Sequence, residues 1–293
     1  MDPDQLRRVR SFNRTVTQRI GALNDHFLGR GRPLGESRLL YEIGHSGAEI
    51  RHLRAQLELD SGYVSRLLRS LERQGLVQAE AGPKDGRVRR VTLTREGMTE
   101  VVELGRRSDA FATSVLAPLS AVQRARLVTA MGEVERLMSA SAVQMKREAS
   151  DSSTARWCLE EYFRELARRF DAGFDPTQSI SANAEELTPP AGVFVVARLG
   201  SRPIGCGALK VKDRDTGEIK RMWVHEEMRG LGIGLRILQE LEAKAREFGL
   251  STLRLETNQI LKEAQAMYRR CGYREVAPFN DEPYAHHWFE KTQ

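Results

Sequence analysis

The stretch Arg229-Gly230-Leu231-Gly232-Ile233-Gly234 decides how the second half of this 293-residue chain is interpreted. A strand-like run, Ile219–Val224, precedes it, and an amphipathic helical pattern, Leu235–Phe248, follows it. Glycines let a backbone approach a phosphate closely, and the first amides of a helix have no partner inside the helix. This strand–loop–helix sequence therefore predicts a binding site for a diphosphate.

Strands and helices alternate on both sides of the glycine loop, which indicates an α/β domain. Further predicted strands are Gly192–Leu199, Ile204–Val211, Leu253–Thr257 and His286–Phe289, and further helices are Trp157–Phe170 and Ala264–Arg270. Two strands come before the one that leads into the loop, whereas dinucleotide-binding glycines stand near the start of a parallel domain. The position of the loop therefore disfavours a dinucleotide site.

The Arg-x-x-Gly-x-Gly loop resembles that of the GNAT acetyltransferase superfamily, in which these amides hold the diphosphate of coenzyme A. Glu218–Val224, Leu253–Asn258 and Ala264–Tyr273 resemble the central strand of the family, its next strand, and its closing helix and turn. The resemblance covers about residues 155–292. It implies a GNAT fold with a mixed central sheet, and direct transfer of an acetyl group from acetyl-CoA to an amine acceptor without a metal.

Acetyl transfer needs a polarised carbonyl and a protonated leaving group. A backbone N–H near Trp223 or Val224 is placed to polarise the thioester carbonyl. By the resemblance, Tyr268 gives a proton to the departing thiolate, and Asn258 bonds to the pantetheine arm. The competing interpretation of Tyr268 is a tyrosine packed in the core.

The attacking amine must lose a proton through water to a carboxylate, and both Glu218 and Glu256 are candidates for that base. The sequence does not separate them, and a solvated strand position is an equally good interpretation of Glu256. The residues expected to bind acetyl-CoA are Trp223, Val224, Arg229, Gly230, Leu231, Gly232, Ile233, Gly234, Leu235 and Asn258.

The front half has the periodicity of a mostly helical winged-helix domain. Its predicted helices are Leu6–Leu28, Glu36–His45, Glu49–Leu57, Asp60–Gln74, Arg95–Val115 and Ala121–Lys146. A β-hairpin is predicted between Leu76 and Thr94, with the turn sequence Pro83-Lys84-Asp85-Gly86 at its tip. Two short helices followed by a hairpin predict a helix-turn-helix with a wing.

Positive charge is concentrated in this front half. Residues 1–146 carry 24 Lys and Arg against 17 Asp and Glu, whereas residues 147–293 carry 22 against 23. An excess confined to one domain favours a polyanionic partner for that domain. The residues expected to face DNA are Ser61, Tyr63, Ser65, Arg66 and Arg69 on the second helix of the motif, and Lys84, Asp85, Arg87, Arg89 and Arg90 on the hairpin.

Asp85-x-Arg87, together with Leu71–Val77, resembles the MarR family of winged-helix regulators over about residues 5–145. The resemblance implies that Asp85 braces Arg87 in the minor groove of a double-stranded operator. It also implies a homodimer formed through the first and last helices of the domain. The competing interpretation is a winged helix that serves only for dimerisation or protein binding.

The sequence thus predicts residues 1–146 as the DNA-binding and dimerisation domain, 147–154 as a linker, and 155–293 as the acetyltransferase domain. Three dispersed cysteines without a Cys-x-x-Cys motif favour a reducing, cytoplasmic location without a zinc site, and no apolar run is long enough for a membrane span. The leading hypothesis is a bifunctional regulator and N-acetyltransferase. The alternatives are a regulator that only senses acetyl-CoA and an enzyme whose front half only dimerises. The acceptor stays open among small amines, amino acids and protein lysines.

Overall fold

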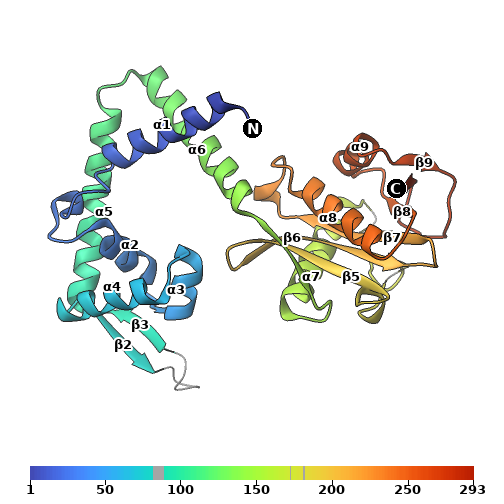
Figure 1. Ribbon diagram of the computed structural model, residues 1–293, viewed down its shortest axis with the longest axis horizontal. Coiled ribbons are helices and arrows are strands. Elements are labelled where there is room, and N and C mark those ends of the chain that lie inside the picture. The colour runs from blue at the N-terminus through green and yellow to red at the C-terminus, as the bar shows by residue number, and fades with distance from the viewer. Residues whose placement is uncertain (82–88, 172, 181) are drawn as a thin grey trace. The chain divides into compact units, whose positions relative to one another are not determined.

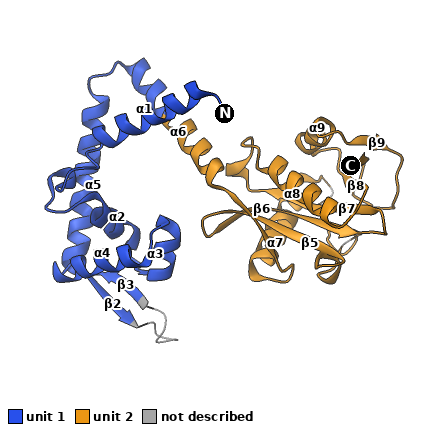
Figure 2. Cartoon of the chain, in the orientation of Figure 1, with its two compact units in different colours: residues 1–130 blue, residues 131–293 orange. Residues whose placement is uncertain are grey.

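The computed structural model describes residues 1–81, 89–171, 173–180 and 182–293 (Figure 1). The chain divides into two compact units, Met1–Ala130 and Met131–Gln293, and each has its own hydrophobic core (Figure 2). Helix α6 (Ala121–Ala142) begins in the first unit and ends in the second. The predicted fold class, a helical winged-helix region followed by an α/β domain with a mixed sheet, is confirmed.

The first unit is helical, with a small sheet in the strand order β1-β3-β2. Besides the start of α6, its elements are α1 (Pro3–Arg19), η1 (Phe27–Gly29), α2 (Leu34–Ile43), β1 (Ala48–Glu49), α3 (Ile50–Leu57), α4 (Ser61–Arg73), β2 (Val77–Ala81), β3 (Arg89–Leu93) and α5 (Arg95–Leu116). Apolar side chains of α2, α3, α4 and α5 meet the two longer strands in one core. Asp60 caps α4 by accepting a hydrogen bond from the Tyr63 amide at 2.8 Å.

Two sequence predictions in this unit were wrong in extent. The helix predicted over residues 6–28 ends at Arg19, because Gly21 adopts a positive φ of 69° that a right-handed helix cannot contain. Ala48 and Glu49 form an extra strand paired with β3, where the sequence predicted the start of a helix. Hydrogen bonding to the hairpin overrides the helical preference of so short a segment.

The second unit contains one seven-stranded sheet in the order β4-β5-β6-β7-β8-β10-β9. Its elements are β4 (Gln144–Glu148), α7 (Ser153–Arg169), η2 (Glu185–Leu187), β5 (Gly192–Leu199), β6 (Arg202–Val211), β7 (Thr216–Val224), η3 (Glu226–Met228), α8 (Ile233–Glu247), β8 (Thr252–Thr257), α9 (Lys262–Arg270), β9 (Arg274–Val276) and β10 (His287–Thr292). Strands β7 and β8 are parallel, and the other neighbouring pairs are antiparallel, so the sheet is mixed.

Helices α7 and α8 cover opposite faces of this sheet. Alternate residues of β5 show the division, since Val193 and Val195 belong to the core under α8, whereas Phe194 and Val196 belong to the core under α7. Burial on both faces explains why β5 reads as a continuous apolar run. The arrangement holds the start of α8 and the middle of α7 near the same end of β7.

The segment expected to be a linker is built into the second unit. Arg147 and Glu148 belong to β4, which pairs antiparallel with β5. Ser152, part of a serine-rich stretch that suggested a flexible tether, caps α7 by accepting from the Ala155 amide at 3.1 Å. The helix predicted over residues 121–146 accordingly ends at Ala142, where the chain turns into β4. The functional boundary at residue 146 stays a prediction.

Candidate functional site

The glycine loop lies at the N-terminus of α8, as the sequence predicts. Gly230 and Gly232 have φ values of 75° and 77°, which side-chain-bearing residues rarely adopt. The first hydrogen bond of the helix runs from the Arg236 amide to the Gly232 carbonyl at 3.1 Å. The amides of Ile233, Gly234 and Leu235 therefore have no intrahelical acceptor. Among the described atoms, none lies within 4 Å of where a Cβ on Gly230 or Gly232 would stand, so this surface is open to a ligand.

Arg229 braces the loop from inside the protein. Its Nε donates to the Val224 carbonyl at 2.9 Å, and its Nη2 forms an ion pair with Glu165 of α7. The same Glu165 oxygen accepts from the indole Nε1 of Trp223 at 2.9 Å. Glu165 is 8% exposed and joins α7, β7 and the loop. Arg229 thus orients the glycine loop, and its guanidinium is engaged by Val224 and Glu165.

Strand β7 separates from its parallel neighbour next to the loop. Its recorded pairing with β8 covers only Thr216–Glu218. A bulge interrupts its pairing with β6 at Arg221, whose φ is 60°. The His225 amide donates to β6 at 2.9 Å, so alternation directs the Trp223 amide to β6 as well and the Val224 amide to the open side. Of the two amides predicted to polarise a carbonyl, the geometry favours Val224.

A pocket of about 440 Å³, here named the loop pocket, lies between α7, the end of β7, the glycine loop and α9. Every residue predicted to bind acetyl-CoA lines it except Leu231 and Asn258. Leu231 packs partly buried against the core. The side chain of Asn258 is engaged elsewhere, since it donates to the Tyr284 carbonyl at 2.8 Å and accepts from the Ile260 amide at 3.0 Å. It orders the turn after β8 instead of facing the loop pocket.

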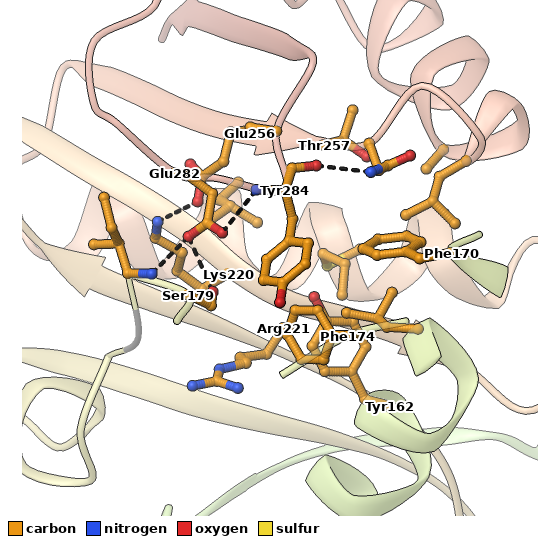
Figure 3. A pocket seen from close by; sticks show the side chains of 18 of the residues that line it. Tyr162, Phe170, Phe174, Ser179, Lys220, Arg221, Glu256, Thr257, Glu282 and Tyr284 are labelled. Atoms are coloured by element: carbon orange, nitrogen blue, oxygen red, sulfur yellow. Dashed lines mark hydrogen bonds and ion pairs between the residues drawn. The ribbon is translucent and has the colours of Figure 1, made fainter. Parts of the chain in front are cut away.

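A second, smaller pocket of about 110 Å³ adjoins the first (Figure 3). It is named the aromatic pocket because the rings of Tyr162, Phe170, Phe174 and Tyr284 line it. Tyr268 belongs to the walls of both pockets, and so do Tyr162, Leu166, Met222, Leu261 and Ala264. These shared residues place the two pockets side by side, where β7 and β8 have separated.

Tyr268 stands at that junction. It is 5% exposed, and its hydroxyl has no hydrogen-bond partner among the residues that the structure describes. Burial raises the pKa of Tyr268 well above its usual range, so the hydroxyl keeps its proton near neutral pH. A protonated, unengaged hydroxyl between two pockets is suited to give a proton to a leaving group.

The structure separates the two candidate carboxylates. Glu256 of β8 lines the aromatic pocket, whereas Glu218 lines neither pocket and lies 3.6 Å from the Nζ of Lys220. Glu256 pairs with Lys220 through Oε1, and its buried Oε2 has no hydrogen-bond partner in the described structure. Burial raises the pKa of Glu256 above its usual range, against the opposing effect of Lys220. Glu256 is therefore the carboxylate placed to accept a proton.

The outward face of α4 is arranged as predicted for a recognition helix. Ser61, Ser65, Arg66 and Arg69 are exposed, and Tyr63 is half-buried with the Arg66 guanidinium 5.7 Å from its ring centre. On the hairpin, Arg90 donates to the Ser46 carbonyl, and Arg89 lies in β3. Lys84, Asp85 and Arg87 lie outside the described residues.

Sequence reasoning missed several residues of the site. Glu165 and Tyr162 belong to the predicted helix Trp157–Phe170, to which the sequence assigned no functional role, and Phe174 lies on the connection after it. The bulge at Arg221 has no sequence signature, because a positive φ at an arginine follows from its surroundings. Strands β9 and β10 pair, and their connection carries Tyr284 and Glu282 into the aromatic pocket.

Within the described ranges, no group of three or more His, Cys, Asp or Glu side chains is arranged to hold a metal ion. No helix in that part of the chain is long and apolar enough to cross a membrane.

Known proteins match each unit separately. Residues 155–273 match the model of the acetyltransferase (GNAT) family, and residues 30–88 match that of the MarR family. An IAA acetyltransferase from Azospirillum brasilense is 40% identical over 96 residues, which are 32% of this chain and 63% of that protein, less than two thirds of its length. YsnE from Bacillus subtilis, described as an uncharacterized N-acetyltransferase, is 34% identical over 109 residues, which are 36% of this chain and 72% of that protein.

For the first unit, YdgJ from Bacillus subtilis, described as an uncharacterized HTH-type transcriptional regulator, is 29% identical over 82 residues, which are 28% of this chain and 50% of that protein. The glycine loop, the separated strands and the family matches agree on the second unit, and the recognition-helix geometry and the family match agree on the first. The chain belongs to the GNAT acetyltransferase family, and it joins that acetyltransferase domain to a MarR-type DNA-binding region.

Proposed function

We propose that the chain is a bifunctional protein, which binds an operator through its first unit and transfers the acetyl group of acetyl-CoA to an amine through its second. The observation that carries the enzymatic half is the row of unpaired amides at the start of α8. Ile233, Gly234 and Leu235 line the loop pocket, and their amides have no intrahelical acceptor, beside two glycines whose surroundings are open. Such a helix start favours a diphosphate through its N–H groups and its dipole.

Acetyl-CoA fits the connected pockets as cosubstrate and supplies an activated thioester. The diphosphate would lie on the glycine loop, and the thioester end would reach the gap between β7 and β8. There the Val224 amide is directed to the open side and would donate to the carbonyl oxygen as negative charge develops on it. The ion pair between Arg229 and Glu165 holds the loop in place during this step.

The acceptor amine would enter from the aromatic pocket. Glu256 receives a proton from the amine through water, the amine nitrogen forms a bond to the carbonyl carbon, and the carbon–sulfur bond breaks. Tyr268 gives its proton to the departing sulfur and recovers one from solvent. Glu218 lines neither pocket, so it is not placed to take the role of base.

The DNA-binding half of the proposal is supported by charge and by an exposed apolar surface. The outward face of α4 presents Arg66 and Arg69, which a major groove accommodates. None of the residues of α1 is buried, and its apolar side chains Val9 and Phe12 are 56% and 44% exposed. An apolar helix face of this kind favours a second copy of the chain, so we propose a homodimer on a two-fold symmetric operator.

One purified preparation tests both halves. Release of free thiol from acetyl-CoA over a panel of amines measures turnover, and a salt-dependent mobility shift with the chain's own promoter DNA measures operator binding. Turnover with DNA binding is the expected result. Tight acetyl-CoA binding without turnover would favour the sensor alternative, and turnover without sequence-dependent DNA binding would favour the enzyme whose first unit only dimerises.

A further inference from the structure

We infer that the acceptor is a small primary amine carried on a single aromatic ring and lacking a carboxylate, an arylalkylamine. This inference rests on the proposed acetyl transfer and names the substrate class of that site. It follows from three properties of the aromatic pocket: the chemistry of its wall, its volume, and the one charged oxygen that it leaves without a partner.

The wall of the pocket is built from ring faces supplied by two separate segments. Phe170 and Phe174 lie on the connection that follows α7, and Tyr284 lies between β9 and β10 (Figure 3). Ring centres lie 4.7 Å apart for Phe174 and Tyr284 and 5.9 Å apart for Phe170 and Tyr284. All three rings are only partly buried, so they keep surface available for an additional ring. Aromatic rings gain from such edge and offset contacts beyond the burial of area.

The volume of the pocket limits the acceptor to one ring. At about 110 Å³ the space is somewhat smaller than the apolar cavity of about 150 Å³ that is known to hold benzene, and it adjoins the loop pocket through six shared lining residues. A single six-membered ring is therefore the largest group that the space admits, and a short chain on it would extend toward Tyr268. Protein lysines present four methylenes and a bulky backbone, and they carry no ring for the edge and offset contacts that the wall offers.

The charged residues of the aromatic pocket determine which substituents the ring of the acceptor can carry. Among the described residues lining the pocket, the cations are Lys220 and Arg221, and both are engaged. Lys220 pairs with Glu256, while the Arg221 guanidinium lies 4.7 Å from the Phe163 ring centre and donates to the Ala182 carbonyl at 3.5 Å. A carboxylate on the acceptor would therefore be desolvated without a ready partner.

An ammonium group on the acceptor, in contrast to a carboxylate, has a carboxylate oxygen available to it. Oε2 of Glu256 is buried and lacks a donor, and it belongs to a side chain only 10% exposed. The second carboxylate of the pocket, Glu282, already accepts from the Ser179 hydroxyl at 2.9 Å and the Ile180 amide at 2.7 Å. Glu256 is thus the group that holds the incoming amine, and the rings hold the remainder of the molecule.

The test compares four acceptors with the full-length chain and saturating acetyl-CoA. The probes are 2-phenylethylamine, L-phenylalanine, propylamine and an N-terminally blocked lysine peptide. We expect kcat/KM for 2-phenylethylamine to exceed that for each of the other three by about tenfold or more, since the others lack the ring or add an unpaired charge. Higher kcat/KM for L-phenylalanine or the lysine peptide would overturn the inference.

A matched pair of variants assigns the preference to the pocket. Phe174→Leu removes a ring from the wall, whereas Phe279→Leu makes the same change at a ring that lies over Arg254 and lines neither pocket. Phe174→Leu should lower kcat/KM for 2-phenylethylamine about fivefold more than that for propylamine, and Phe279→Leu should change neither. An equal loss for both amines in Phe174→Leu would contradict ring recognition.

Equilibrium binding separates this inference from the proposed enzymatic activity. Calorimetric titration of 2-phenylethylamine into the protein saturated with CoA should give saturable binding, weakened in Phe174→Leu and absent with L-phenylalanine. Binding without acetylation would refute acetyl transfer while supporting the amine pocket. Absence of 2-phenylethylamine binding would overturn the substrate class, whatever turnover other amines show.

Discussion

Replacing Glu165 by leucine should destabilise the second unit and loosen the glycine loop together. The substitution removes the acceptor of the buried Trp223 indole N–H, and an unsatisfied buried donor costs about 1–3 kcal/mol. It also removes the ion pair with Arg229, whose side chain is 36% exposed, so hydration limits that contribution to about 1 kcal/mol. The free energy of unfolding should therefore fall by about 2–4 kcal/mol. Glu161→Leu, on the same helix, breaks a pair with the 58% exposed Arg164 and should cost less than about 1 kcal/mol.

Tryptophan fluorescence isolates the effect, because Trp157, Trp223 and Trp288 are the only tryptophans of the chain and all lie in the second unit. Urea unfolding followed by this signal should show a lower midpoint for Glu165→Leu with an unchanged slope. The affinity for CoA should fall about tenfold in the same variant, since Arg229 no longer holds the loop in its binding conformation. Equal midpoints for the two variants, or a lower midpoint with undiminished CoA affinity, would refute the bracing role.

The remaining predictions concern catalysis, pH and DNA. Tyr268→Phe should lower kcat roughly a hundredfold and spare CoA binding, while Tyr162→Phe should have a smaller effect, and single-turnover thiol release compares them. Glu256 must be ionised to accept a proton, and its pKa is raised above 4.5, so kcat/KM should increase with pH over a range that lies above pH 4.5. Glu256→Gln should abolish this increase. Arg66→Ala should weaken operator binding about tenfold without changing the dimer, measured by mobility shift and sedimentation; unchanged affinity would remove α4 from the interface.

Several elements of the fold could be predicted because the sequence patterns that specify them are local. Helix α8 shows an amphipathic period bounded by glycines, and β5 shows a continuous apolar run, and both follow from burial alone. Helix α4 of the first unit could be predicted for the same reason, because Asp60 marks its N-terminal cap and a stripe of apolar residues marks its buried face. Strand β4 was not predictable, because an edge strand of polar residues gains its stability from pairing with β5 and not from its own composition.

The candidate site likewise contains residues that could be predicted from the sequence and residues that could not. The amides of the glycine loop could be assigned from sequence, because they depend on a glycine pattern before a helix. The choice of Glu256 over Glu218 could not, since both lie on strands and only the separation of β7 from β8 places one of them on a pocket. The aromatic pocket also escaped prediction, because Phe174 and Tyr284 lie 110 positions apart on irregular connections.

Calorimetric titration of the full-length protein with acetyl-CoA, and separately with S-acetylpantetheine, tests the central claim most directly. The two ligands share the thioester and the pantetheine arm, but only acetyl-CoA carries the diphosphate that the amides of Ile233, Gly234 and Leu235 would bind. The account predicts saturable binding of acetyl-CoA and at least a hundredfold weaker binding of S-acetylpantetheine. Equal affinities, or no heat with acetyl-CoA at millimolar concentration, would contradict it.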